Sequence, residues 1–217
     1  MSAEIIDGFS IAQQVRKQAA DEAAELTGKG TTPCLAVVLV GENPASVSYV
    51  TAKEKALEEA GMKGKDIRLP QDTTEADLLQ LIHDLNEDTS VHGILVQLPL
   101  PKHIDEDKVI MAIKPEKDVD GFHPVNVGNM MIGRKSYLPC TPHGVLVLLK
   151  TMGIATAGKH AVIVGRSNIV GKPLSVLLTR KEYNATVTVC HTGTKDLSSF
   201  TRQADILIAA AGSPAMI

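Results

Sequence analysis

Short apolar runs that alternate with helical patterns limit the fold of this chain more than any other feature of its sequence. The runs are continuous, rich in β-branched residues and bounded by turn-forming residues, which is typical of strands buried on both faces of a parallel sheet. They cover Leu35–Val40, Gly93–Leu98, Ala161–Val164, Thr186–Val189 and Ile206–Ala211. Helical patterns lie between them, over Ile11–Leu26, Ala45–Ala60, Glu75–Leu85, Pro142–Met152 and Gly171–Leu178. The alternation predicts an α/β fold with helices on both faces of a mostly parallel sheet.

A segment rich in proline and glycine, residues 114–142, interrupts this series. Enough elements for one α/β domain precede it, and a new series of strands and helices follows it. We therefore expect two α/β domains, residues 1–140 and 141–217. A cleft between two such domains is a common place for a ligand, so we expect one there.

Composition narrows the classes of function. The chain has 217 residues, a formal charge of −3, no tryptophan, three tyrosines and three phenylalanines, so we expect no nucleic-acid-binding face. The longest apolar run, Cys34–Val40, is far shorter than the roughly 20 residues of a membrane span. The three cysteines lie far apart and show no zinc-binding spacing. We predict a cytoplasmic protein with no metal site, no membrane contact and no nucleic-acid partner.

The segment from Lys159 to Pro173 has the order of a strand, a turn and a helix start. Gly165 permits a tight turn, and Gly171 lets backbone amides face an anion. The segment is not a Walker P-loop, because five residues separate the glycines and Pro173 replaces the magnesium-binding hydroxyl residue. It also lacks the second glycine of G-x-G-x-x-G, where Ser167 stands. The spacing alone leaves two interpretations open, a phosphate-binding turn and a plain strand–helix connection.

The end of the next predicted strand indicates which cofactor such a turn would bind. NAD-specific folds place a carboxylate there to hold the ribose hydroxyls. In this chain His191, Thr192, Gly193 and Thr194 follow the strand, and none of them is acidic. Hydroxyls together with Arg166 suit the 2′-phosphate of NADP better. The alternative is that Arg166 is an ordinary surface charge.

Lys53 has an unusual place on the predicted helix over residues 45–60. It lies within an apolar stripe that includes Tyr49 and Val50, whereas Glu54, Lys55, Glu58 and Glu59 occupy the other side. A desolvated ammonium has a lowered pKa, which is how a lysine becomes a general base near neutral pH. The alternative is a lysine whose stem packs while its amine reaches water.

Three further polar residues lie within apolar or turn-forming segments of the sequence. Gln97 lies at the carboxyl end of a predicted strand, where ligands of open α/β sheets bind. Asp118 and Asp120 flank Val119 before a glycine, which suits either a turn or a weak metal site. The sequence contains no motif for zinc-dependent or serine-triad hydrolysis.

Five segments taken together resemble the bifunctional methylenetetrahydrofolate dehydrogenase/methenyltetrahydrofolate cyclohydrolase family. Each is moderately specific alone, but five in the same order along the chain are highly specific. They are Gly41–Lys53, Ile94–Pro101, Lys117–Pro124, Pro139–Gly144 and Gly165–Pro173.

The resemblance implies a two-domain enzyme that binds tetrahydrofolate derivatives. It would oxidise 5,10-methylenetetrahydrofolate to the methenyl cation and hydrolyse that cation to 10-formyltetrahydrofolate. By the resemblance, Lys53 is the acid/base group of hydrolysis, Tyr49 packs against and positions the folate, and Gln97 holds Lys53 in its useful protonation state. Asp120 would accept hydrogen bonds from the pterin ring and act with these three as a catalytic residue. The folate-binding set would be completed by Val96 and Leu98.

On the cofactor side, the resemblance implies a Rossmann-like domain that binds NADP. Gly165, Arg166 and Ser167 would hold the cofactor phosphates, with Thr192 beside the 2′-phosphate. A homodimer formed through this domain is also implied. Family members continue well past Ile217, so we expect a C-terminally truncated cofactor domain. Two alternatives are another NADP-dependent dehydrogenase and a folate- or nucleotide-binding module with little turnover.

Overall fold

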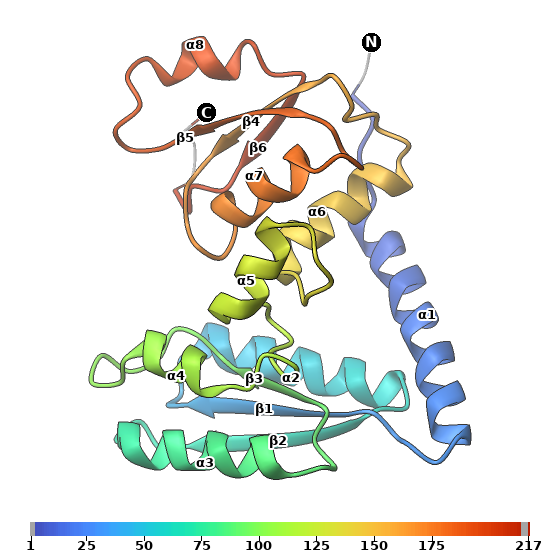
Figure 1. Cartoon of the computed structure of the whole chain (residues 1–217), viewed down its shortest axis with the longest axis vertical. Helices are drawn as coiled ribbons and strands as arrows, with labels where there is room; N and C mark the ends of the chain where they lie inside the picture. The colour runs from blue at the N-terminus through green and yellow to red at the C-terminus, as the bar shows by residue number, and fades with distance from the viewer. Residues whose placement is uncertain (1–2, 214–216) are drawn as a thin grey trace. The chain divides into compact units, whose positions relative to one another are not determined.

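Two parallel sheets of three strands each organise the chain, and each sheet belongs to its own compact unit (Figure 1). The computed structural model describes residues 3–213 and residue 217. One unit spans Asp7–Val119, and the other spans Asp120–Ile217 together with the segment before Asp7. No helix in these described residues combines the length and apolar character needed to cross a membrane.

The first unit has the strand order β2-β1-β3, with β1 paired in parallel to both neighbours. Successive side chains of β1 point to opposite faces of the sheet. Val37 and Leu39 therefore pack with Val50 of α2, while Ala36 and Val38 share a larger core with α3 and α4. The elements are α1 (Gly8–Gly28), β1 (Cys34–Val40), α2 (Pro44–Glu59), β2 (Lys63–Leu69), α3 (Glu75–Glu87), β3 (Gly93–Val96) and α4 (Glu106–Ala112).

The second unit repeats this plan with the order β5-β4-β6, again all parallel. Ala161 and Ile163 of β4 pack on the layer of α5, α6 and α7, whereas Val162 and Val164 face α8. The elements are α5 (Pro124–Met131), α6 (Cys140–Thr151), β4 (His160–Val164), α7 (Gly171–Thr179), β5 (Thr186–Cys190), α8 (Leu197–Thr201) and β6 (Ile206–Ala209).

The predicted α/β class is confirmed, and all five predicted strands and all five predicted helices are present. The prediction missed β2 and the short helices α4, α5 and α8. It was also wrong to expect β6 to be buried on both faces. Among the described strands β6 pairs with β4 alone, and Leu207 is 43% exposed.

The two compact units are divided between Val119 and Asp120, inside the segment rich in proline and glycine. Residues 120–140 were predicted from the sequence to belong to the first domain, but in the structure they cluster with the second unit. A functional boundary near residue 140 stays a prediction.

Candidate active site

Lys53 and Gln97, which are 44 residues apart in the sequence, meet at the carboxyl end of β3. Helix α2 is started by Asn43, whose side chain accepts hydrogen bonds from Ala45 N and Ser46 N. The buried Val50 fixes the face of α2 that packs on the sheet, and the half-buried Lys53 lies one turn further along it. Its Nζ donates to Gln97 Oε1 at 2.9 Å.

The backbone and the side chain of Gln97 are both held. Its backbone N–H donates to Val38 O at 2.8 Å, which continues the pairing of β3 with β1. Its Nε2 donates to Leu98 O at 2.8 Å. Because the amide nitrogen is used in this way, the amide oxygen is the atom turned to Lys53. The pair thus has one defined donor and one defined acceptor.

The other expected folate-side residues have different surroundings. Tyr49 is 65% exposed, so its ring is available to a ligand and adds little to the core. Val96 and Leu98 pack with the core beneath α3 and α4, so their contacts to a substrate would come from their backbone.

Asp118 and Asp120 lie where the chain leaves the first unit. Asp118 is buried and forms an isolated parallel bridge with Ile94, and Asp120 is half-buried. Among the described residues, no group of three or more His, Cys, Asp or Glu side chains is arranged to hold a metal ion. The segment around Asp118 and Asp120 folds as turns, which agrees with the turn interpretation.

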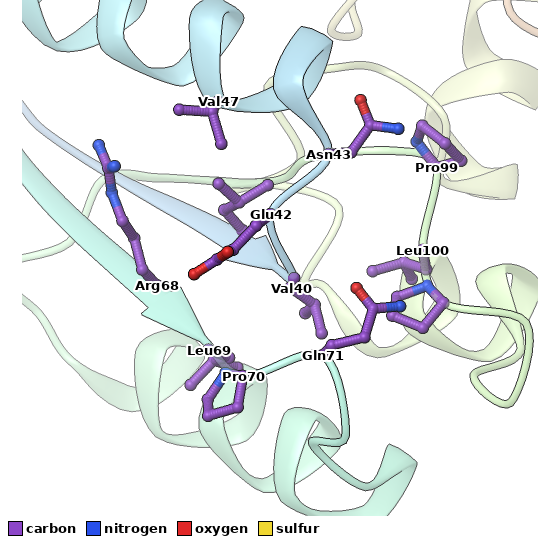
Figure 2. Close-up of a pocket in the computed structure, with 13 residues that line it drawn as sticks. Val40, Glu42, Asn43, Val47, Arg68, Leu69, Pro70, Gln71, Pro99 and Leu100 are labelled. Atoms are coloured by element: carbon purple, nitrogen blue, oxygen red, sulfur yellow. The ribbon is translucent and has the colours of Figure 1, made fainter.

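A groove of about 1110 Å³ opens at the carboxyl ends of β1 and β2 (Figure 2). Figure 2 shows Arg68 on one side of it and Pro99 with Leu100 on the other. Lys53 and Gln97 do not line this groove, but it shares helix α2 and the loop after β3 with them. It is lined by Leu39–Asn43, Val47, Arg68–Gln71 and Pro99–Pro101.

The charged rim of the groove comes from β2. Arg68 Nε donates to Asp66 Oδ2 at 2.7 Å, and Arg68 Nη2 lies 3.4 Å from Glu54 Oε2. A hydrogen bond shared with Asp66 raises the pKa of the Glu54 carboxyl above its usual value, and burial raises it further. Glu54 therefore contacts β2 and does not simply face solvent. The pattern of apolar runs in the sequence did not predict β2. Arg68, which lies on this strand, was therefore not predicted to lie near the site.

The turn after β4 requires glycine at two positions. Gly165 has a φ of +133°, and a Cβ there would lie 2.3 Å from Ala210 O. A Cβ on Gly171 would lie 2.0 Å from Gly165 O. The close approach of backbone segments within the turn therefore requires glycine at both positions. Helix α7 begins at Gly171 without a side-chain cap hydrogen bond. Lys172 N donates to Ser167 O at 3.1 Å and Pro173 has no N–H, so among the first three residues of the helix the Gly171 N–H is the backbone donor that could face an anion.

The expected cofactor residues gather at the carboxyl ends of two neighbouring strands. Val164 at the end of β4 pairs with Cys190 at the end of β5, and Gly165 N donates to Cys190 O at 2.8 Å. The turns after the two strands therefore lie side by side. Arg166, Ser167 and Thr192 are exposed in these turns. Ser167 Oγ accepts from Val170 N at 3.1 Å, which tightens the first turn.

The fold and these two sites define an α/β enzyme that combines an amine–amide pair with a dinucleotide-type turn. The chain belongs to the tetrahydrofolate dehydrogenase/cyclohydrolase family. The model of that family's catalytic domain matches residues 6–120, and the model of its NAD(P)-binding domain matches residues 139–217.

Relatives of known name agree with this assignment. The chain is 59% identical to a bifunctional protein FolD of Exiguobacterium sibiricum over 99% of its own length and 77% of the relative. A FolD methylenetetrahydrofolate dehydrogenase/cyclohydrolase of Campylobacter jejuni has a TM-score of 0.94, is 50% identical and covers 97% of this chain and 74% of that one. The methylenetetrahydrofolate dehydrogenase-cyclohydrolase of Trypanosoma brucei, solved with NADP cofactor and inhibitor, has a TM-score of 0.93 and is 39% identical. The match covers 99% of this chain and 74% of that one.

Proposed function

We propose that this chain performs both reactions of its family on tetrahydrofolate derivatives. In the first, 5,10-methylenetetrahydrofolate is oxidised to the 5,10-methenyl cation. In the second, water adds to the methenyl carbon and one carbon–nitrogen bond breaks, which gives 10-formyltetrahydrofolate. The observation that supports the second reaction best is the contact of 2.9 Å between Lys53 Nζ and Gln97 Oε1 at the end of a parallel strand.

For the hydrolytic step, we assign Lys53 the proton transfers. Its amine would accept a proton from the attacking water and later deliver one to the departing nitrogen. Gln97 would keep the amine in place through its fixed amide oxygen. The exposed ring of Tyr49, one helical turn away, would pack against the folate, and Asp120 would accept hydrogen bonds from the pterin ring. Val96 and Leu98 would contact the substrate through their backbone.

For the oxidation, the glycine turn after β4 and the Gly171 N–H at the start of α7 would face a dinucleotide phosphate group. Gly165, Arg166 and Ser167 would hold the cofactor phosphates, and Thr192 would lie beside a 2′-phosphate. NADP, when bound, accepts a hydride from the methylene carbon. No acid or base of the protein is needed for that transfer, so the task of the chain is to hold and orient the two molecules.

Replacing the amine tests the assignment of Lys53. Lys53→Met should lower cyclohydrolase turnover by about 100-fold or more, the usual contribution of a positioned acid/base group, while NADP binding is retained. Turnover is followed by the absorbance of methenyltetrahydrofolate, and binding by calorimetry. Lys55→Met is the matched control, because Lys55 lies on the same helix with its side chain 78% exposed. Unchanged hydrolysis in Lys53→Met would remove Lys53 from its role.

Replacing the guanidinium tests the preference for NADP over NAD. Arg166→Ala should weaken NADP binding by about tenfold or more, the loss of one charge-assisted contact, and should change NAD binding much less. Arg202→Ala, another exposed arginine of the same unit, is the control. Equal affinity of the unaltered protein for NADP and NAD, measured by calorimetry, would contradict the preference.

We also propose that the protein is a cytoplasmic homodimer. The support is the family resemblance together with the three cysteines, which lie far apart in the sequence and suit a reducing compartment. Sedimentation equilibrium over a concentration series would test the dimer, and a monomer at all concentrations would contradict it.

A further inference from the structure

We propose that Glu106 is a positioning residue for hydrolysis, because it anchors the loop that holds Gln97 against Lys53. This inference rests on the roles proposed above for Lys53 and Gln97. Glu106 is the first residue of α4, and its Oε1 accepts a hydrogen bond from Leu100 N at 3.1 Å. No sequence motif singles it out, since an acidic residue in the first turn of a helix is common.

The first part of the loop between Gln97 and α4, residues 98–101, has few backbone donors. Pro99 and Pro101 lack an N–H group, so Leu98 and Leu100 carry the only backbone donors in residues 98–101. Glu106 takes the second of these donors. One carboxylate thus restrains the backbone N–H in the middle of this segment.

Fixing this backbone also fixes the orientation of the Gln97 amide. The acceptor for Gln97 Nε2 is the carbonyl oxygen of Leu98, two residues before the amide that Glu106 holds. If the loop shifts, Leu98 O moves and the amide is free to turn. Its NH₂ group would then face the Lys53 ammonium. Because both groups are hydrogen-bond donors, no hydrogen bond would form between them. The lysine would lose the contact that positions it for proton transfer.

The loop has other anchors that do not involve Glu106. Leu100 and Ile104 are buried in the core under α3 and α4. Glu75 accepts from Asp105 N at 2.9 Å and pairs with Lys108 at 2.7 Å. These contacts are expected to keep the unit folded when Glu106 is replaced, so a change in its activity is measurable.

The test compares cyclohydrolase with dehydrogenase turnover in the same sample. Glu106→Ala should lower the cyclohydrolase kcat by about tenfold, the loss of one well-placed contact, while the dehydrogenase kcat and the KM for the folate change by less than about twofold. Glu106→Met, which keeps the length of the side chain without an acceptor, should behave in the same way. Glu106→Gln keeps Oε1 and should restore the ratio of the two activities.

Glu75→Ala is the matched structural control. It removes contacts at the same helix start without touching Leu100, so it should lower the melting temperature and leave the ratio of activities unchanged. An equal fall of both activities in Glu106→Ala, or an unchanged cyclohydrolase kcat, would overturn the positioning role. If Lys53→Met loses hydrolysis but Glu106→Ala does not, only this inference fails. If Lys53→Met retains hydrolysis, the proposed function itself fails.

Discussion

Gly171 lies so close to the preceding turn that no side chain fits at this position. A Cβ would meet Gly165 O at 2.0 Å and the carbonyl carbon of Gly165 at 2.6 Å, and backbone atoms do not move aside as a flexible side chain would. Gly171→Ala should therefore displace the turn, destabilise the second unit by about 2 kcal/mol or more, and weaken NADP binding. Thermal melting and calorimetry measure the two effects.

Gly128 provides the control for this substitution. It lies within α5, and a Cβ there would meet nothing within 4 Å. Gly128→Ala should stabilise the protein by about 0.5–1 kcal/mol, because alanine loses less entropy than glycine in a helix. An equal effect of the two substitutions would show that packing at Gly171 does not matter.

Single residues also show how far the sequence could be used to find the site. The glycines of the cofactor turn follow from their spacing, and Lys53 is conspicuous because a charge interrupts an apolar stripe. The contact of Lys53 with Gln97 depends on how α2 packs on the sheet and on the pairing of β1 with β3, which no local pattern contains. Glu106 was not identifiable, because its contact with Leu100 depends on the path of a loop that contains two prolines.

Among the elements, strand β2 shows why polar strands are not predicted from apolar runs in the sequence. Its sequence, Lys63–Leu69, is mostly charged, because β2 lies at the edge of its sheet and, among the described strands, pairs with β1 alone. Charged side chains protect such an edge from pairing with other chains. Central strands such as β1 and β4 were identified because they are buried between two helical layers. The sequence thus predicts the interior of each sheet better than its edges.

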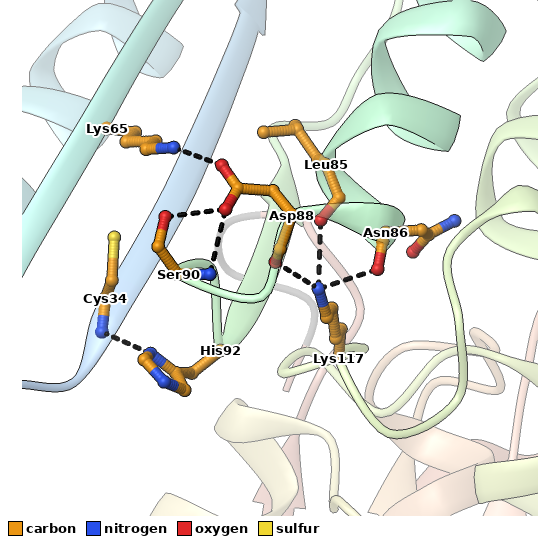
Figure 3. Close-up of polar contacts among 8 residues, drawn as sticks. All are labelled: Cys34, Lys65, Leu85, Asn86, Asp88, Ser90, His92 and Lys117. Atoms are coloured by element: carbon orange, nitrogen blue, oxygen red, sulfur yellow. Dashed lines mark hydrogen bonds and ion pairs between the residues drawn. The ribbon is translucent and has the colours of Figure 1, made fainter. Parts of the chain in front are cut away.

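Two lysines from outside the connection between α3 and β3 hold it in place (Figure 3). Lys117 Nζ donates to the carbonyl oxygens of Leu85, Asn86 and Asp88 at 2.8–3.0 Å, which satisfies groups left open at the end of α3. Lys65 of β2 donates to Asp88 Oδ2 at 2.5 Å. The bond to Lys65, followed by those from Ser90, holds the pKa of the Asp88 carboxyl well below its usual range.

The lowered pKa of Asp88 predicts how stability depends on pH. A carboxyl with a lowered pKa in the folded state stabilises the fold above its unfolded pKa of about 3.9, and this contribution is lost as the pH falls through the folded pKa. Asp88→Asn should therefore lower the melting temperature at pH 7, and the difference from the unaltered protein should shrink below about pH 4. Asp72→Asn, at an exposed aspartate before α3, is the control. A difference in melting temperature that is the same at all pH values would contradict the ionic origin.

At the scale of the whole molecule, each unit has a sheet and a core of its own. In the first unit, β1 lies between α2 and the layer of α3 and α4, and in the second, β4 lies between α8 and the layer of α5 to α7. The residues assigned to hydrolysis, Lys53 and Gln97, belong to the first unit, and those assigned to the cofactor belong to the second. Each unit can therefore be perturbed separately, by a mutation in the first and by a ligand in the second.

Calorimetric melting should then resolve two transitions that respond to different changes. We assign NADP binding to the folded second unit alone. At a concentration of 100 times its Kd, NADP should therefore stabilise that unit by about 2.7 kcal/mol and raise the midpoint temperature of one transition. Asp88→Asn acts on the connection between α3 and β3 in the first unit, so at pH 7 it should lower the midpoint temperature of the other transition. With NADP and the mutation together, the two shifts should appear independently, since the sites share no partner. A single transition that moves with both changes would show that the two cores unfold as one.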